Sequence, residues 1–419
     1  MPAAAATLAA TATTSAQQLI RQKAVSTSLP YLTRLAENPY AHTGQWILGT
    51  AGLVVGMIQV GAVTRLTQSG LSMTTWSPLG SLPPMTHDAW QEEFERYKQF
   101  PEWEQRQSMT LRDFQYIYAW EYGHRMMGRF IGVAFTLPWI YFTVRRRIPT
   151  GYQARMLGLW TMGGMQGAVG WWMVKSGLGD DRRGEKKEIR VQPVRLAAHL
   201  TMALATYGAL VWTGLDILSL PHTTTNNGSA NRMVSFAESL GKETLRSLGR
   251  VRVGSWLLTG LTAVTITSGA LVAGNDAGRA YNTWPTMNGR DFFVVPEAWP
   301  VDKPWFWTVT KDTATTQGNH RFLASLTAAT GLGLVGAVVA SGPLWAGAAL
   351  TPQVRQGIIA VGVTVLGQYS LGIATLLNYV PLSLAVAHQF GSLTVFTSGL
   401  YLTHTLRYAS RRVVKQAIR

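Results

Sequence analysis

Cysteine is absent from this chain of 419 residues. The protein can therefore form no disulfide and has neither a thiolate metal ligand nor a cysteine nucleophile. Acidic residues are also scarce: 21 Asp and Glu stand against 37 Lys and Arg, which gives a formal net charge of +16. Mean hydropathy is only +0.08, so the average composition does not by itself indicate a membrane protein.

Apolar residues are nevertheless concentrated in eight runs that are long enough to span a bilayer, because about 20 helical residues cross its ~30 Å hydrocarbon core. Polar connections, chiefly 77–115 and 275–315, lower the average hydropathy. The sequence therefore predicts an all-α membrane protein with eight transmembrane helices. The predicted spans are 44–66, 116–143, 153–175, 194–218, 252–274, 320–340, 354–377 and 383–406.

Basic residues gather in three segments that fall on one side of the membrane when successive spans alternate in direction. The positive-inside rule places this side, with both termini, in the matrix or cytoplasm. The charge thus indicates membrane orientation rather than nucleic-acid binding. A fourth basic segment, between the third and fourth spans, is offset by acidic neighbours. The three clusters are Arg145, Arg146, Arg147 and Arg155; Arg232, Lys242, Arg246, Arg250 and Arg252; and Arg407, Arg411, Arg412, Lys415 and Arg419, and the offset segment contains Arg182, Arg183, Lys186 and Lys187.

The N-terminal residues 1–36 contain Arg21, Lys23 and Arg34, many small residues and no acid. This composition is typical of a mitochondrial transit segment, with an ordinary disordered tail as the alternative. The predicted organisation follows from the runs and the charge. It is a tail with the transit segment (1–43), an N-terminal four-helix half (44–218), a basic inner-side linker (219–251), a C-terminal four-helix half (252–408) and a basic tail (409–419).

The two halves resemble each other in sequence. Residues 61–76 align with 269–284 at a constant offset, with five identities, and the match continues through the later spans. Each half has four spans, an even number, so both halves share one orientation. The pattern predicts two tandem parallel four-helix bundles related by a pseudo-two-fold axis along the membrane normal. Further matches are Gln166 with Gln368, Gly170 with Gly372, His124-Arg125 with His320-Arg321, and Ala198-His199 with Ala387-His388.

Each half contains two histidines at matched positions: His124 and His199 in the first, His320 and His388 in the second. All four begin even-numbered spans, so we expect them at one depth near the outer side of the membrane. Paired imidazoles are common axial ligands of haem iron, and we interpret the four as two haem-ligand pairs. Zinc or copper is the alternative, although no acid or sulfur ligand recurs beside both pairs. The unmatched histidines, expected to be structural or solvated, are His42, His87, His222 and His404.

The two halves differ three residues before the first histidine, where Glu121 in one half stands against Gln317 in the other. This spacing places each side chain on the same helical face as its histidine. An acid at membrane depth is unfavourable and indicates function by default. Pairing with Arg125 or Arg129, or a favourable charge near a helix N-terminus, is the structural alternative. We predict that Glu121 is catalytic.

An arginine directly follows the first histidine of each pair. A guanidinium group recognises carboxylates through two parallel hydrogen bonds. Arg125 and Arg321 are therefore candidate contacts for haem propionates, with phospholipid headgroups as the alternative.

These motifs resemble the heme A synthase family, of the mitochondrial and alphaproteobacterial type that lacks cysteine. The resemblance covers roughly 44–408. It includes GAVTRLTQSGLSMTTWSP, EYGHRMMGR, QGAVGWWMVKSGL, RLAAHLTM, NTWP, NHRF and AHQF. Some bacterial members have a pair of cysteines in an outer loop, which this chain lacks. A mechanism that depends on those cysteines is therefore not expected here.

The resemblance implies oxidation of the C8 methyl group of haem O to the formyl group of haem A, for the assembly of cytochrome c oxidase. It also implies that His320 and His388 ligate a resident haem b. The substrate or product haem would be held by His124 and His199. Glu121 would correspond to the functionally important acid of the family.

The resemblance further implies partners and a location. A haem O synthase (a farnesyltransferase) would supply the substrate, a ferredoxin-type or quinone partner would exchange electrons, and cytochrome c oxidase assembly factors and a homo-oligomer are expected. The expected location is the mitochondrial inner membrane with both termini in the matrix, and the bacterial cytoplasmic membrane is the alternative. Two other functions stay open: a di-haem b-type electron-transfer cytochrome without its own chemistry, and a transporter, since parallel repeats are common in transporters.

Overall fold

The computed structural model describes residues 38–410, apart from 78, 180–188, 221–235, 290–302, 343 and 345–349, together with residue 413. This part of the chain is helical and contains no strand, which confirms the predicted all-α class. Several predictions lie outside the described residues: the transit segment, the basic residues at 182–187, Arg232, His222, and the charged tail after residue 410 except residue 413.

Eight helices of 23 residues or more dominate the described part. Six of them are long and apolar enough to cross a membrane, and the other two are α5 and α14. The expectation of eight spans therefore stays a prediction for these two helices. The eight are α2 (Ala41–Leu66), α4 (Leu111–Val144), α5 (Gln153–Lys175), α6 (Pro193–Leu218), α8 (Lys242–Gly274), α11 (Thr313–Ala340), α13 (Pro352–Leu377) and α14 (Leu382–Thr405).

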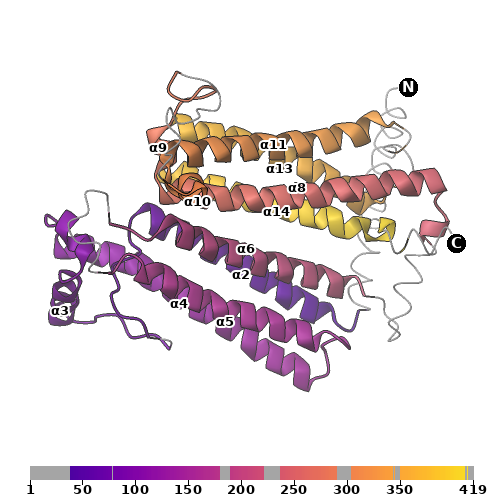
Figure 1. Ribbon diagram of the computed structural model, residues 1–419. Coiled ribbons are helices and arrows are strands. Elements are labelled where there is room, and N and C mark those ends of the chain that lie inside the picture. The colour runs from indigo at the N-terminus through magenta and orange to yellow at the C-terminus, as the bar shows by residue number, and fades with distance from the viewer. Residues whose placement is uncertain are drawn as a thin grey trace, which may run out of the picture.

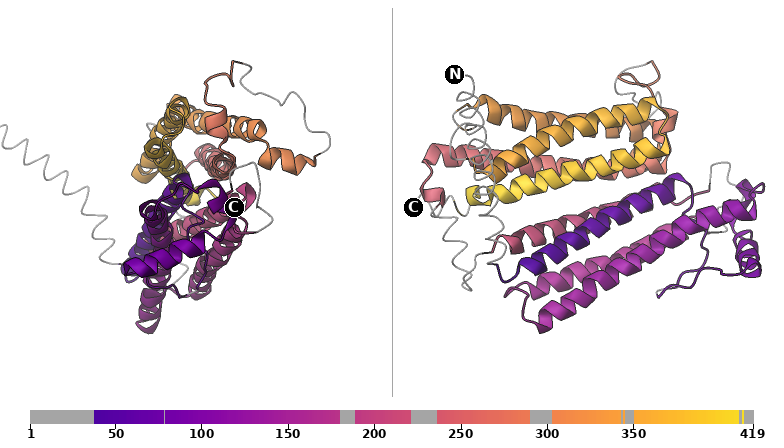
Figure 2. Two further views of the ribbon diagram at one scale, coloured as in Figure 1. Left: turned by 90° about the vertical axis from the view of Figure 1, so that its left-hand side faces the viewer. Right: turned by 180° about the vertical axis from the view of Figure 1, so that it is seen from behind.

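The long helices lie in two groups, one above the other in Figures 1 and 2. In the first group, α2 and α5 each pack against both α4 and α6. In the second group, α8 and α13 each pack against both α11 and α14. Across the boundary between the groups, α6 packs against α8, and α14 packs against α2 and α6. The two groups therefore meet through the first and fourth long helices of each.

Apolar packing joins the two groups. A continuous core combines α2 and α6 with residues of α8 and α14, including Phe396 and Leu400. Gly208 of α6 lies directly against the ring of Phe396, where an added Cβ would be 3.2 Å from ring carbons. The Tyr207 hydroxyl is 2.6 Å from that of Thr397 on α14. Because helices in lipid associate through close van der Waals packing and interhelical hydrogen bonds, this shared core holds the two groups together.

Two polar clusters also connect the groups, one at each end; the end predicted to face the matrix or cytoplasm is called inner, and the opposite end is called outer. At the inner end, Asp216 of α6 lies 3.0 Å from Nε2 of His404 on α14 and accepts a hydrogen bond of 2.7 Å from Arg155. At the outer end, Asp276 pairs with Arg190 and lies 3.8 Å from Arg65 at the end of α2. His404 is thus buried in the inner cluster, in agreement with the structural role expected for it.

Three helices begin at least five residues earlier than their apolar runs predicted. α4 begins at Leu111 instead of 116, because Thr110 and Asp113 form a reciprocal capping box. α11 begins at Thr313 instead of 320, because the Asp312 carboxylate accepts from the Thr315 backbone N–H. α8 begins at Lys242, inside the segment predicted as the linker 219–251. The histidines consequently lie within their helices; His124 is several turns from the start of α4.

Short helices cover the end of the molecule to the left in Figure 1. They are α3 (His87–Tyr97), the 3-10 helix η1 (Pro101–Gln105), α9 (Ala277–Ala280) and α10 (Trp305–Lys311). An aromatic cluster joins α3 and η1 to the first turns of α4; Phe94 and Phe114, for example, stack with ring centroids 5.0 Å apart. Burial raises the pKa of Tyr97, whose hydroxyl donates to Glu102. This cluster fixes the part of α4 that precedes Glu121.

Candidate functional site

The second histidine pair faces across the second helix group. His320 on α11 and His388 on α14 have ring centroids 6.5 Å apart and planes at 88°. An ion between two imidazoles, with metal–nitrogen bonds of about 2 Å on each side, would place the ring centres roughly 6 Å apart. The measured separation therefore fits one iron ion between the two rings.

The first histidine pair occupies corresponding helices of the first group. His124 lies on α4 and His199 on α6, the second and fourth long helices of that group. Both pairs thus connect a helix at the boundary between the groups, α6 or α14, with a helix farther from it, α4 or α11.

Each of the four rings packs against a glycine of a neighbouring helix. A Cβ on Gly61 would lie 2.9 Å from Cε1 of His124, and one on Gly170 would lie 3.0 Å from Cε1 of His199. The corresponding distances are 3.2 Å from Gly269 to His320 and 2.8 Å from Gly372 to His388. Any side chain at these positions would displace the ring. The sequence matched these glycines between the halves but did not show that they contact the histidines.

Three of the four rings have a neighbour at Nδ1. The Gln166 amide nitrogen is 3.2 Å from Nδ1 of His199, and that of Gln368 is 3.0 Å from Nδ1 of His388. The Ser268 hydroxyl oxygen is 2.7 Å from Nδ1 of His320. Nδ1 of His124 is buried and has no hydrogen-bond partner among the described residues.

The neighbour of His320 suits ligation of iron through Nε2. A ligating imidazole carries its proton on the other nitrogen and donates it to an oxygen. The Ser268 hydroxyl donates to the Thr265 carbonyl at 2.8 Å, so its oxygen is free to accept from Nδ1. Each glutamine has a buried amide oxygen without a hydrogen-bond partner in the described structure. The amide nitrogen of each glutamine also donates to the backbone carbonyl of its histidine at 2.9 Å, which holds the nitrogen, and not the oxygen, beside Nδ1.

Haem fits these pairs better than a metal ion held by protein alone. No group of three or more His, Asp or Glu side chains in the described ranges could hold a metal ion. Structural zinc sites need about four protein ligands. Haem iron needs only two axial ligands from the protein, because the macrocycle supplies the others.

Glu121 is buried, with 2% of its surface exposed, and its carboxylate is fully engaged. One oxygen accepts from the Ser72 hydroxyl at 2.7 Å and from the Met73 backbone N–H at 2.8 Å. The other oxygen accepts from Arg125 at 2.5 Å. The ion pair with Arg125 considered as a structural alternative is therefore present, and the catalytic role of Glu121 stays a prediction. At the matching place, the amide oxygen of buried Gln317 has no partner among the described residues.

The two arginines after the first histidines bind backbone carbonyls of the loops beside them. Arg125 donates to the Thr75 carbonyl at 2.7 Å, and Arg321 donates to the Thr283 carbonyl at 2.5 Å. Thr75 and Thr283 are matched positions in the two halves. Sequence reasoning missed this role, because nothing in the sequence shows which carbonyls an arginine will reach. Contact of either arginine with a haem propionate stays a prediction.

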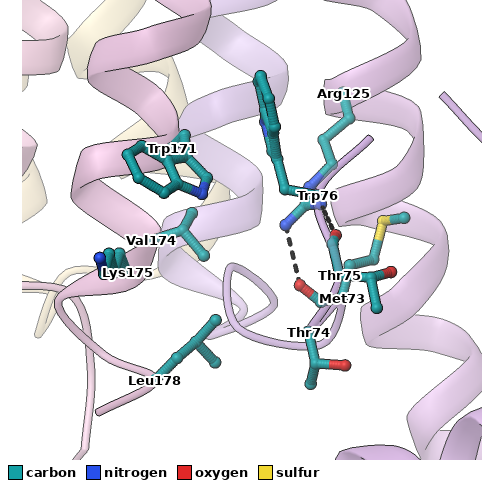
Figure 3. A pocket seen from close by; sticks show the side chains of 9 residues that line it. All are labelled: Met73, Thr74, Thr75, Trp76, Arg125, Trp171, Val174, Lys175 and Leu178. Carbon is teal, nitrogen blue, oxygen red and sulfur yellow. Dashed lines mark hydrogen bonds between the residues drawn. The ribbon is translucent and has the colours of Figure 1, made fainter. Parts of the chain in front are cut away.

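A cavity of about 200 Å³ lies between the loop 73–76 and the end of α5 (Figure 3). It is lined by the loop 73–76, Arg125 and the end of α5, including Trp171 and Lys175. The Lys175 ammonium group lies 5.2 Å from the centre of the Trp171 ring. Trp171 directly follows Gly170, the glycine in contact with His199. The cavity therefore provides apolar and cationic surface, and two of its lining residues directly follow His124 and Gly170 in the chain.

The fold and the site define an all-helical membrane protein with two half-buried histidine pairs, one of them beside a buried carboxylate. The chain belongs to the cytochrome oxidase assembly protein family COX15-CtaA, whose model matches residues 44–400. This membership confirms the resemblance predicted from the motifs.

Three relatives illustrate the range of the family. Heme A synthase COX15 of Arabidopsis thaliana is 41% identical over 377 residues, covering 89% of this chain and 76% of the relative. Heme A synthase of Nitrosomonas eutropha is 38% identical over 368 residues, covering 86% of this chain and 92% of the relative. A heme A synthase–mitochondrial ferredoxin fusion protein of Schizosaccharomyces pombe is 38% identical over 384 residues, covering 88% of this chain and 61% of the relative.

Proposed function

We propose that this protein is a heme A synthase, an enzyme that oxidises the C8 methyl group of haem O to the formyl group of haem A for cytochrome c oxidase. Membership of the COX15-CtaA family and similarity to proteins named heme A synthase support this activity. The structural observation that carries it is the break between two otherwise similar histidine pairs. Only the first has a buried carboxylate one helical turn before its histidine.

In the proposed architecture all eight long helices span the membrane as two tandem four-helix bundles, related by a pseudo-two-fold axis along the membrane normal. The helix contacts support it, because they are unchanged when α2, α4, α5 and α6 are exchanged with α8, α11, α13 and α14. The contacts between the groups obey the same exchange: α6 with α8 corresponds to α14 with α2.

In the proposed division of roles, His320 and His388 ligate a resident haem b, and His124 and His199 hold the substrate haem O or product haem A. Haem b supplies one-electron redox chemistry when it is bound. The four histidines would hold the two haems in fixed orientations, because each imidazole ring packs against a glycine of a neighbouring helix. The cavity lined by Trp171 and Lys175 would receive part of the substrate at the first pair.

Glu121 would act as the proton acceptor at the first pair. Conversion of a methyl group to a formyl group removes electrons and protons from one carbon and adds one oxygen atom. A carboxylate held by Ser72, Met73 and Arg125 stays in one place while protons leave that carbon. A ferredoxin-type partner would exchange electrons with the haem sites, and the fused ferredoxin of the S. pombe relative supports this choice over a quinone.

We place the protein in the mitochondrial inner membrane with both termini in the matrix, and a bacterial cytoplasmic membrane is the alternative. The composition of residues 1–36, the side of the basic clusters and the plant relative support the mitochondrial location. Haem O synthase would supply the substrate, and cytochrome c oxidase assembly factors would receive the product.

Pigment analysis of the purified protein, combined with conversion of added haem O, tests this proposal. We expect His320→Ala and His388→Ala to lose haem b. His124→Ala and His199→Ala should keep most haem b absorption and lose formation of haem A. His42→Ala, a change near the start of α2, is the matched control and should behave as the wild type.

Three other outcomes would contradict the proposal in different ways. Loss of haem b from the His124 and His199 variants, instead of the other two, would reverse the assignment of the pairs. Haem at both pairs without conversion of haem O would indicate the electron-transfer cytochrome. A purified protein without Soret absorption would exclude haem at both pairs and favour a transporter.

A further inference from the structure

The two histidine pairs differ in what lies at Nδ1 of their first ligand. We infer that Ser268 is a positioning residue that makes the second pair retain its haem, and that Val60, at the matching place, leaves His124 as the releasing ligand of the first pair. This inference rests on the proposed function, because it takes haem to bind at both pairs.

Val60 and Ser268 occupy equivalent places. Each directly precedes the glycine, Gly61 or Gly269, against which the first histidine of its pair packs. The two glycines are matched in the sequence comparison of the halves, so residues 60 and 268 are matched too. One is an apolar valine and the other a serine, which is 8% exposed.

Ser268 fixes the orientation of His320 through a chain of two hydrogen bonds. Its hydroxyl proton goes to the Thr265 carbonyl at 2.8 Å, within the same helix. Its oxygen, 2.7 Å from Nδ1, therefore accepts the imidazole N–H. The lone pair of the ring is then on Nε2, the atom available for iron. Such partners hold a ligand ring in orientation and increase its basicity.

His124 lacks this support. Its Nδ1 is buried without a partner in the described part of the chain. The side chain of Val60 has no acceptor atom, and the Val60 carbonyl accepts from the Thr64 hydroxyl at 2.8 Å. The second ligand of each pair is no source of the difference, because His199 and His388 both have a glutamine at Nδ1. The asymmetry is therefore confined to His124 and His320.

This asymmetry matches what the two sites have to do. A resident redox group must stay bound through many turnovers, whereas a substrate must enter and its product must leave. Removal of such an outer partner typically lowers metal affinity by about 10–100-fold. A difference of this size at one ligand would allow release at the first pair and retention at the second.

The experiment measures transfer of haem from the purified, haem-loaded protein to excess apomyoglobin, together with the midpoint potential of haem b. We expect Ser268→Ala to release haem b about tenfold faster or more, and to shift its potential. Ser268→Thr, which keeps the hydroxyl, should restore the wild-type rate. Ser255→Ala is the matched control, because Ser255 is a buried serine of the same helix whose hydroxyl bonds only the Val251 carbonyl.

The reciprocal change adds the missing group to the first pair. We expect Val60→Ser to slow the release of haem A by about tenfold and to lower turnover through slow product release. Val60→Ala, which changes size without adding a hydroxyl, should not slow release. This variant keeps the inference testable even if Ser268→Ala fails to fold.

The outcomes separate this inference from the proposed function. Wild-type protein without haem at either pair would overturn both. Haem at both pairs, with wild-type release rates in Ser268→Ala or in Val60→Ser, would overturn the inference and leave the proposed function intact. Equal acceleration in Ser268→Ala and Ser255→Ala would also overturn it, because the effect would then come from general loosening of the helix.

Discussion

Replacement of Glu121 by glutamine removes one buried negative charge with little change in shape. The carboxylate accepts three hydrogen bonds, from Ser72, Met73 and Arg125. A glutamine has one acceptor oxygen, so its NH₂ group must face a donor on one side. Breaking a buried ion pair costs about 3–5 kcal/mol. Arg125 keeps two carbonyl acceptors in Glu121→Gln, at Thr75 and Met73, so we expect the lower end of this range, about 3 kcal/mol.

Glu121→Gln should lower the rate of haem A formation by more than its loss of stability would explain. Loss of a positioned acid or base typically lowers a rate by about 10²–10⁴-fold. We therefore expect Glu121→Gln to form haem A at least about a hundredfold more slowly while haem b absorption is retained. Haem extracted after incubation with haem O gives the rate, Soret absorption gives haem b, and thermal unfolding in detergent gives the stability.

Ser72→Ala is the matched variant for this prediction. It removes one hydrogen bond to the Glu121 carboxylate but leaves the charge and the Arg125 ion pair in place. We expect it to lose about tenfold in rate, because one hydrogen bond to a charged group contributes about 1.5–3 kcal/mol while the carboxylate and its ion pair stay in place. A wild-type rate in Glu121→Gln would refute a catalytic role. Equal losses in Glu121→Gln and Ser72→Ala would show that Glu121 acts only by holding the loop.

Two further predictions concern glycine packing and the inner polar cluster. Gly372→Ala should weaken haem b binding by about tenfold or more, because a Cβ there would lie 2.8 Å from Cε1 of His388 and the displaced ring would no longer meet the iron. Gly367→Ala on the same helix has no neighbour within 4 Å and serves as the control, so equal haem b content in both would contradict this reasoning. Asp216→Asn should lower stability by about 1.5–3 kcal/mol, because the charged partner of Arg155 and His404 is lost. Thermal unfolding measures this effect, and an unchanged melting temperature would show that the cluster does not stabilise the contact between the groups.

The positions of the long helices could be predicted from hydropathy because each apolar run is bounded by polar connections. The starts of α4 and α11 could not, because they depend on side chains that cap polar turns outside the apolar run. Thr110 with Asp113, and Asp312 with Thr315, supply these caps. The capping pattern is visible in the sequence, but a search for apolar spans does not use it.

The comparison of the two halves predicted the part of the site that is visible as matched or mismatched residues. That comparison selected the two histidine pairs and the Glu121–Gln317 difference. It did not reveal the neighbours of the rings, because contacts between helices depend on how each helix is rotated and how close it lies to the next. Ser268 is an example: it lies among matched residues, but only its 2.7 Å distance from His320 connects it to the site.

Each histidine pair joins a helix of the shared core to a helix on the outside of its group. For the first pair the outer helix is α4. Only 6% of the residues in its most apolar stretch are buried, against 39% in those of α2 and α6. An outward movement of α4 would carry His124 away from His199 while the contact between the groups stayed closed. Under the proposed function, exchange of haem at this pair would need α4 to release the loop held by Glu121 and Arg125, but would need no separation of the two groups.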